Sequence, residues 1–136
     1  LFAEYSSDFD FVFLDAPAGL EGGFRLAAEC ADKCIIVTNP DPVSIRAASA
    51  ASQKVRLFGI DDVRLVINKF NKRKDISLNI DNIIDVSCAR LLGIIPYDKN
   101  TSFIVASDDS STGPKFRKAY KRIAERLEGA DIPLSV

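Results

Sequence analysis

The sequence contains no histidine and no Cys-x-x-Cys pair, so it offers little of the ligand chemistry typical of zinc and dithiol redox sites. Its 18 basic and 19 acidic residues leave no overall charge to attract nucleic acid or an anionic membrane. No apolar run approaches the ~20 residues of a membrane span, and no signal peptide is evident. These absences favour a cytoplasmic protein whose partners are recognised by local chemistry.

Three cysteines are present, and all lie in apolar stretches of sequence. We expect Cys30, Cys34 and Cys88 to be reduced thiols of the core, with a metal or redox role as the alternative. The length of 136 residues suits one domain that buries roughly two thirds of its extended-chain surface. We therefore expect residues 1–136 to form a single domain.

Residues 9–19 form an apolar run that ends in a carboxylate and a glycine-terminated turn. The continuous apolar segment from Phe11 to Leu14 predicts a central parallel strand that is covered on both faces. Asp15 follows this strand directly, and ligands of open α/β sheets bind outside such carboxyl ends. A carboxylate there can hold Mg²⁺ beside a phosphate, or it can simply cap the following turn.

Further along, apolar runs alternate with helical patterns. We expect strands at residues 33–38, 63–67 and 91–98, and helices at 21–29, 42–58, 80–89 and 115–127. Asp41 is a candidate N-cap, Pro42 a candidate first helical residue, and Gly59 a stop signal. This alternation predicts an α/β fold in which helices sandwich a parallel sheet.

The helix predicted at residues 115–127 has an apolar stripe opposite a strongly basic face. The stripe is what a helix that covers a sheet needs, whereas the basic face would suit an anionic partner. The charged residues 71–75 similarly predict a solvated loop, with partner contact as the alternative. Gly22 and Gly23 allow either a flexible or a tightly packed helix start.

Three segments carry motifs of one family. Residues 15–19 fit Asp-x-Pro-Ala-Gly, residues 38–46 fit T-x-P-[DE]-x-x-[SA]-[VI]-R, and residues 91–98 fit L-x-G-x-I-P-x-D. With these motifs the chain resembles, over nearly its whole length, the MinD/ParA group of P-loop ATPases, on the MinD side of that group. No G-x-x-x-x-G-K-[ST] phosphate loop occurs, so the chain looks like the carboxyl-terminal half or more of such a protein.

The resemblance implies a doubly wound, mostly parallel sheet of the P-loop NTPase type, here one partial domain over residues 1–136. It also implies that Asp15 orients Mg²⁺, through water, beside ATP. The turn residues that would sense the γ-phosphate are Pro17, Ala18 and Gly19. The residues that would hold adenine are Asn68, Pro96, Tyr97 and Asp98. The residues that would support the dimer or the switch are Thr38, Pro40 and Arg46.

Read from the residues alone, Asn68 also fits a turn, and the segment after Pro96 also fits a plain strand end. Many relatives place an acid where this chain has Ala47, which puts any dimer contact or catalytic contribution of that acid in doubt.

The activity that the resemblance implies is ATP hydrolysis coupled to dimerisation and to placement of the division septum, with protein regulators as partners. The alternatives are a ParA-like ATPase that positions DNA, flagella or other cargo, and a non-catalytic module without a phosphate loop. We expect residues 1–136 alone to be inactive, to bind no nucleic acid directly, and to reach a membrane only through a tail outside this chain.

The family's strand order places the phosphate-loop strand between the strand that ends at Asp15 and the one that ends at Thr38. Without it, a central apolar gap would expose unpaired backbone groups, each costing ~1 to 3 kcal/mol. We therefore expect the gap to be filled by another polypeptide segment or by a rearranged sheet, or the chain to be part of a longer one.

Overall fold

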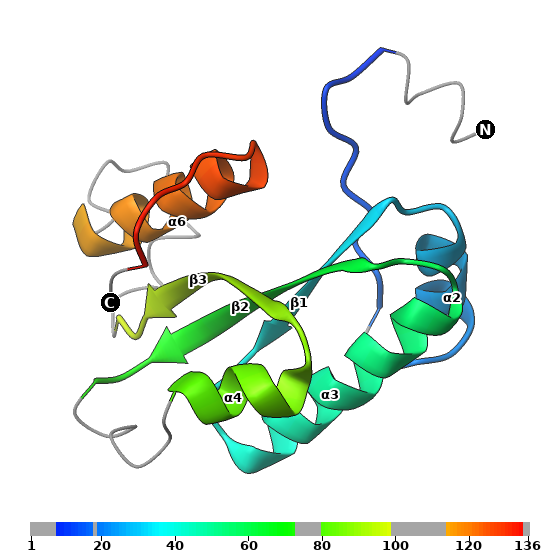
Figure 1. Cartoon of the computed structure of the whole chain (residues 1–136), viewed down its shortest axis with the longest axis horizontal. Helices are drawn as coiled ribbons and strands as arrows, with labels where there is room; N and C mark the ends of the chain where they lie inside the picture. Colours follow the sequence, from blue (N-terminus) through cyan, green and yellow to red (C-terminus); the bar gives the residue numbers. More distant parts are fainter. Residues whose placement is uncertain (1–7, 18, 73–79, 99–113, 135–136) are drawn as a thin grey trace.

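The computed structural model describes residues 8–17, 19–72, 80–98 and 114–134 (Figure 1). The elements follow the chain in the order α2 (Gly22–Glu29), β1 (Lys33–Thr38), α3 (Pro42–Leu57), β2 (Asp62–Phe70), α4 (Ile80–Ser87), β3 (Arg90–Pro96) and α6 (Pro114–Leu127). Within these ranges, no helix has the length and apolar content needed to cross a bilayer.

The described strands form a parallel sheet in the order β1-β2-β3. Figure 1 shows α3 and α4 on one face of this sheet and α6 on the other. The helices between the strands return the chain to the edge of the sheet at which each strand begins. The carboxyl ends of all three strands therefore lie together at the opposite edge. The prediction of a parallel sheet with helices on both faces is thus confirmed.

The central strand, β2, is buried on both faces. The larger apolar cluster joins β2 to α3 and α4 through Val63, Leu65, Ile67, Ile45, Val55 and Ile83. The smaller cluster joins β2 and β3 to α6 through Val66, Leu92, Ile95, Phe116, Ile123 and Leu127. The apolar stripe of α6 therefore covers the sheet, as its spacing predicted. Most of the basic residues of α6 are exposed, whereas Arg126 is half-buried and donates to the backbone carbonyl of Leu92 at 2.8 Å.

The limits of α3 follow from local chemistry. The Asp41 carboxylate accepts hydrogen bonds from the backbone N–H groups of Val43 at 3.1 Å and Ser44 at 2.9 Å. Pro42 occupies the first helical position, and Gly59 takes a left-handed conformation with φ of 86° after the last turn. The predicted N-cap and stop signal are both confirmed.

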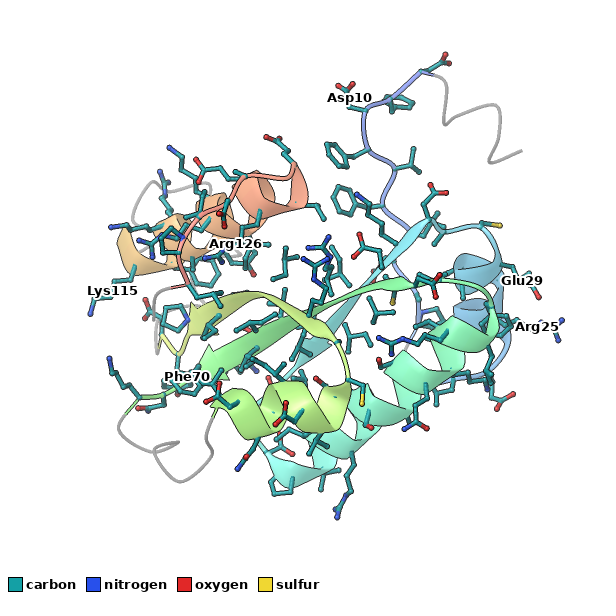
Figure 2. All side chains as sticks on the ribbon, viewed as in Figure 1. Asp10, Arg25, Glu29, Phe70, Lys115 and Arg126 are labelled. Carbon is teal, nitrogen blue, oxygen red and sulfur yellow. The ribbon has the colours of Figure 1, made fainter. Side chains whose placement is uncertain are left out.

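The strand predicted from Phe11 to Leu14 is wrong, because this segment belongs to no strand and most of it faces solvent. Phe13 is 72% exposed. Figure 2 shows Asp10, in the same segment, projecting away from the sheet. A strand forms only where a neighbour pairs with it, and residues 9–17 lie across a groove from β1 instead of joining it. The expected filling of this gap is not seen among the described residues, and the sheet is not rearranged across it.

The expectation of core thiols is wrong for Cys30 and Cys88, whereas Cys34 does pack against the larger apolar cluster. Cys30 and Cys88 are exposed and Cys34 is half-buried, and all three are free. Cys30 ends α2, and Cys88 lies in the turn after α4 with a left-handed φ of 51°. Apolar neighbours in the sequence do not bury a residue that ends a helix, because the chain turns outward there.

Candidate functional site

A groove separates residues 9–17 from β1 and α3. It has a volume of about 1140 Å³, and its lining includes Asp15, Pro17, Gly19, Thr38 and Asn68. Much of its wall is apolar: Val37 of β1, which is 61% exposed, lines it together with the phenylalanines of the segment opposite. One cavity therefore gathers predicted site residues that are as far apart in the sequence as positions 15 and 68.

The turn after Asp15 is held against the start of α2. Asp15 itself is exposed on the groove wall. Gly19 has a φ of 102°, a left-handed conformation that glycine adopts readily. A Cβ on Gly23 would lie 2.6 Å from Cγ of Pro17, so only glycine allows this close approach. Ala18, the remaining predicted residue of this turn, lies outside the described residues.

The carboxyl end of β1 continues directly into the N-terminus of α3. Thr38 is buried, and its hydroxyl donates to the carbonyl of Asn39 at 3.2 Å. The Asp41 carboxylate accepts a further bond of 2.6 Å from the hydroxyl of Ser44. The Ser44 hydroxyl and then the backbone N–H groups of Ser44 and Val43 lower the pKa of Asp41, because they stabilise its charged form.

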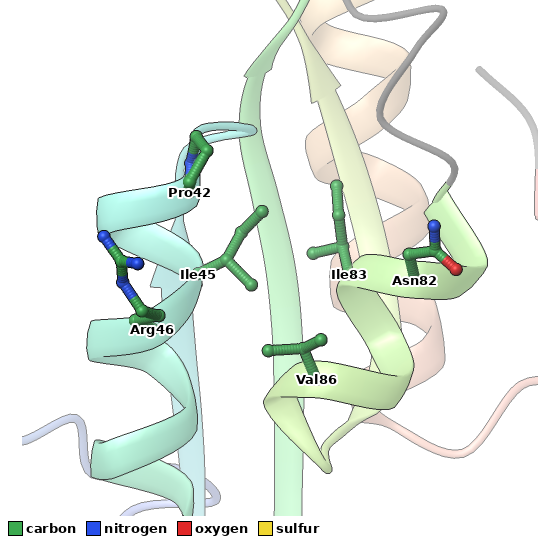
Figure 3. Close-up of a pocket in the computed structure, with 6 residues that line it drawn as sticks. All are labelled: Pro42, Ile45, Arg46, Asn82, Ile83 and Val86. Atoms are coloured by element: carbon green, nitrogen blue, oxygen red, sulfur yellow. The ribbon is translucent and has the colours of Figure 1, made fainter.

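A second, smaller cavity lies between α3 and α4 (Figure 3). It has a volume of about 230 Å³ and is lined by Pro42, Ile45, Arg46, Asn82, Ile83 and Val86. Arg46 therefore lies at this cavity and not at the groove, whose lining includes neither Arg46 nor Pro40.

At the carboxyl end of β2, the backbone departs from regular strand geometry. Lys69 has a φ of 55°, and the pairing of β2 with β3 is irregular between Ile67 and Phe70. The Asn68 side-chain oxygen accepts the backbone N–H of Lys69 at 2.9 Å. A left-handed lysine is strained, and such strain gathers at functional sites. Both Asn68 and Lys69 line the groove. Sequence reasoning missed Lys69, because residue type gives no signal for its backbone conformation.

The segment after β3 lies outside the groove. The backbone N–H of Tyr97 donates to the carbonyl of Phe70 at 2.8 Å, which fixes Tyr97 beside the end of β2. Tyr97 is exposed, and Asp98 is half-buried. Pro96, Tyr97 and Asp98 do not line the cavity that holds Asn68. The structure therefore brings the predicted phosphate-side residues that it describes to the same groove as Asn68, whereas Pro96, Tyr97 and Asp98 follow the neighbouring strand outside that groove.

The groove could hold Mg²⁺ through the single carboxylate of Asp15. Among the described residues, no group of three or more Cys, Asp or Glu side chains gathers into a metal cage. Mg²⁺ commonly binds through one or two carboxylates together with water and phosphate oxygens. The exposed carboxylate of Asp15 fits that mode, with the remaining ligands supplied by water and by a nucleotide.

Comparisons with known proteins agree with this geometry, although no family model matches the sequence. The septum site-determining protein MinD of Synechocystis is 31% identical over 143 residues, which cover 98% of this chain and 53% of the relative. The MinD of Bacillus subtilis is 34% identical over 148 residues, which cover 98% of this chain and 52% of the relative. The chain thus spans about half the length of these relatives.

Solved structures give the same result for the fold. The MinD cell division protein of Aquifex aeolicus superposes with a TM-score of 0.88 and 27% identity, over 98% of this chain and 59% of that one. A MinC:MinD cell division protein complex from the same organism gives a TM-score of 0.85 at 28% identity, over 98% of this chain and 58% of that one. In sequence and in fold, this chain is MinD/ParA-like, and it spans about half the length of the MinD proteins that it matches.

Proposed function

We propose that this chain is a partial P-loop NTPase domain of a MinD-type ATPase, which couples ATP binding and hydrolysis to dimerisation and to placement of the division septum. The observation that carries the proposal is the groove, whose lining includes Asp15, Pro17 and Gly19 as well as Asn68. The phosphate-loop strand would occupy the part of this groove along β1, and we place the nucleotide at the carboxyl ends of β1 and β2, beside Thr38 and Asn68.

Each group has a task that its chemistry suits. The Asp15 carboxylate holds a water ligand of Mg²⁺, and the cation, when bound, neutralises charge on the phosphate oxygens. The turn from Pro17 to Gly19 lies next to the γ-phosphate and responds to its loss. The Asn68 oxygen already accepts one N–H from Lys69, which leaves its NH₂ group and a second lone pair for the edge of a purine. We assign adenine contacts to Pro96, Tyr97 and Asp98 as well, once a bound base brings them to Asn68.

Partners follow from the same proposal. One structural relative is a MinC:MinD complex, which supports protein regulators of the division site as partners of this chain. A homodimer that depends on ATP would use the carboxyl edge of the sheet, where Thr38, Pro40 and Arg46 support the switch. Localisation in the cytoplasm, and at the inner face of the membrane through a segment outside residues 1–136, belongs to this proposal.

The test is a substitution at Asp15 in a polypeptide that carries residues 1–136 together with a phosphate loop. Asp15→Asn should lower ATP turnover on the order of 10²-fold, because it removes charge at the cation. The free energy of unfolding should change by no more than about 0.5 kcal/mol, as is usual for an exposed side chain.

Asp61→Asn is the matched control, because Asp61 is an exposed carboxylate just before β2 and does not line the groove. It should leave both turnover and stability unchanged. If Asp15→Asn instead lowers the melting temperature substantially and leaves turnover intact, the carboxylate serves the turn, and the proposed Mg²⁺ role is wrong.

A further inference from the structure

A lysine of α3 reaches across to the segment between the Asp15–Gly19 turn and α2. The Lys54 ammonium donates a hydrogen bond of 2.5 Å to the backbone carbonyl of Leu20. It also lies 3.6 Å from Oε1 of Glu21. The Lys54 side chain is only 33% exposed, whereas that of Glu21 is 97% exposed. The carbonyl is therefore the ordered partner, and the ion pair with a fully solvated carboxylate adds little.

Leu20 and Glu21 form the joint between the turn and the helix. The Glu21 carbonyl accepts the first bonds of α2, from the backbone N–H groups of Phe24 at 2.8 Å and Arg25 at 3.4 Å. No side chain caps this helix, and its first turn contains no acid. Packing holds α2 to the core, since Ala28 lies in the larger apolar cluster and Phe24 packs against it, whereas the contact of Pro17 with Gly23 joins the turn to α2.

The electrostatics argue that the role of Lys54 is attachment and not helix stabilisation. The N-terminus of a helix carries a partial positive charge, so a cation beside it is unfavourable. Lys54 nevertheless places its ammonium there, half-buried, where its hydrogen bond to a backbone carbonyl offsets that cost. The contact acts on α2 only indirectly, because it orders Leu20 and with it the adjoining Glu21, whose carbonyl accepts the N–H groups of Phe24 and Arg25.

We propose that Lys54 is a positioning residue that ties the Asp15–Gly19 turn, through Leu20, to α3, so that the turn and α3 move as one unit. This inference rests on the proposed function in one respect: the turn is a phosphate sensor only if the groove binds a nucleotide. Lys54 then determines how far the turn can travel independently of α3, and hence how a change at the phosphate reaches the helix that begins at the carboxyl end of β1.

The test is site-resolved amide hydrogen exchange on residues 1–136 without nucleotide, so its outcome is independent of whether the groove binds ATP. Lys54→Met keeps the side chain's length and removes the donor. We expect the exchange rates of the Phe24 and Arg25 amides to rise about threefold to tenfold, which is the factor that corresponds to the loss of one net hydrogen bond. The core amides of Leu65 and Ile67 in β2 should be unchanged.

Two controls isolate the contact. Gln53→Met places the same side chain at the neighbouring exposed position of α3 and should change nothing. Lys54→Arg keeps a cationic donor and should stay within about twofold of the wild type. Unchanged exchange at Phe24 and Arg25 in Lys54→Met overturns the proposal. It is also overturned by an equal rise in the β2 core, or by equal effects of the Met and Arg variants.

Discussion

Gly93 of β3 lies directly against Ile123 of α6, and its replacement tests the packing of these two elements. A Cβ at Gly93 would lie 2.3 Å from Cγ1 and 2.9 Å from Cδ1 of Ile123. Both distances are far inside van der Waals contact. Because Gly93 is buried in the strand that α6 covers, the added methyl group cannot turn toward solvent.

The magnitude follows from the cost of overpacking. Gly93→Ala forces Ile123 out of its place or pushes α6 away from the sheet, which should lower the free energy of unfolding by about 1 to 3 kcal/mol. Ile123→Ala alone should lower the free energy of unfolding by about 1 to 3 kcal/mol. This is less than is usual for a fully buried isoleucine, because Ile123 is half-buried. Cβ of Ile123 lies 3.7 Å from the added atom, an ordinary contact, so the double variant removes the clash.

The assay is urea denaturation of the four proteins of this double-mutant cycle. The double variant should be more stable than the sum of the single effects predicts, by about 0.5 to 3 kcal/mol. Gly22→Ala is the matched control, because nothing lies within 4 Å of a Cβ at that position, and it should change stability by less than about 1 kcal/mol. A neutral Gly93→Ala, or strictly additive effects, would refute the packing of α6 against β3.

Substitutions at two further positions and one binding partner test other parts of the account. At the left-handed Lys69, replacement by glycine should be tolerated, whereas Lys69→Val should cost more than about 1 kcal/mol in urea denaturation, because β-branched residues avoid this conformation. The pKa of Asp41 is lower in the folded protein than in the unfolded chain. The Asp41 carboxylate therefore stabilises the fold fully at pH values above its pKa in the unfolded chain, and this stabilisation is lost as the pH falls through its pKa in the folded protein. Between about pH 6 and pH 2, the melting temperature of Asp41→Asn should therefore fall less than that of the wild type. An equal fall in the two proteins would contradict the role of Asp41 as the N-cap of α3. A polypeptide that supplies the phosphate-loop strand should protect the amide of Val37 against exchange, and unchanged exchange in the bound state would show that it does not pair with β1.

Local signals allowed most of the fold to be predicted. The ends of α3 follow from Asp41, Pro42 and Gly59, which act on their immediate neighbours. The strands around Val63 and Leu92 follow from continuous apolar runs. The segment from Phe11 to Leu14 has the same pattern, but pairing is a property of two segments, and a groove keeps this segment from pairing with β1.

The candidate site was predictable in part. Asp15, Gly19 and Asn68 could be named from motifs, and the structure brings them to one groove. Neither the contact from Lys54 to Leu20 nor the left-handed backbone of Lys69 could be named, because the first joins positions 34 residues apart and the second is a backbone property. The exposure of Cys30 was missed because apolar neighbours in the sequence do not show whether a residue at the end of a helix faces the core.

The central claim is that the groove between residues 9–17 and β1 becomes an ATP site once a phosphate loop is supplied. The most direct measurement is steady-state ATP turnover with Mg²⁺ for residues 1–136 alone and for a polypeptide that joins them to a phosphate-loop half. We predict negligible turnover for the chain alone, because it lacks the amides and the lysine that neutralise the β- and γ-phosphates, and clear turnover for the joined polypeptide. Comparable turnover by residues 1–136 alone, or none by a folded joined polypeptide, would contradict the account.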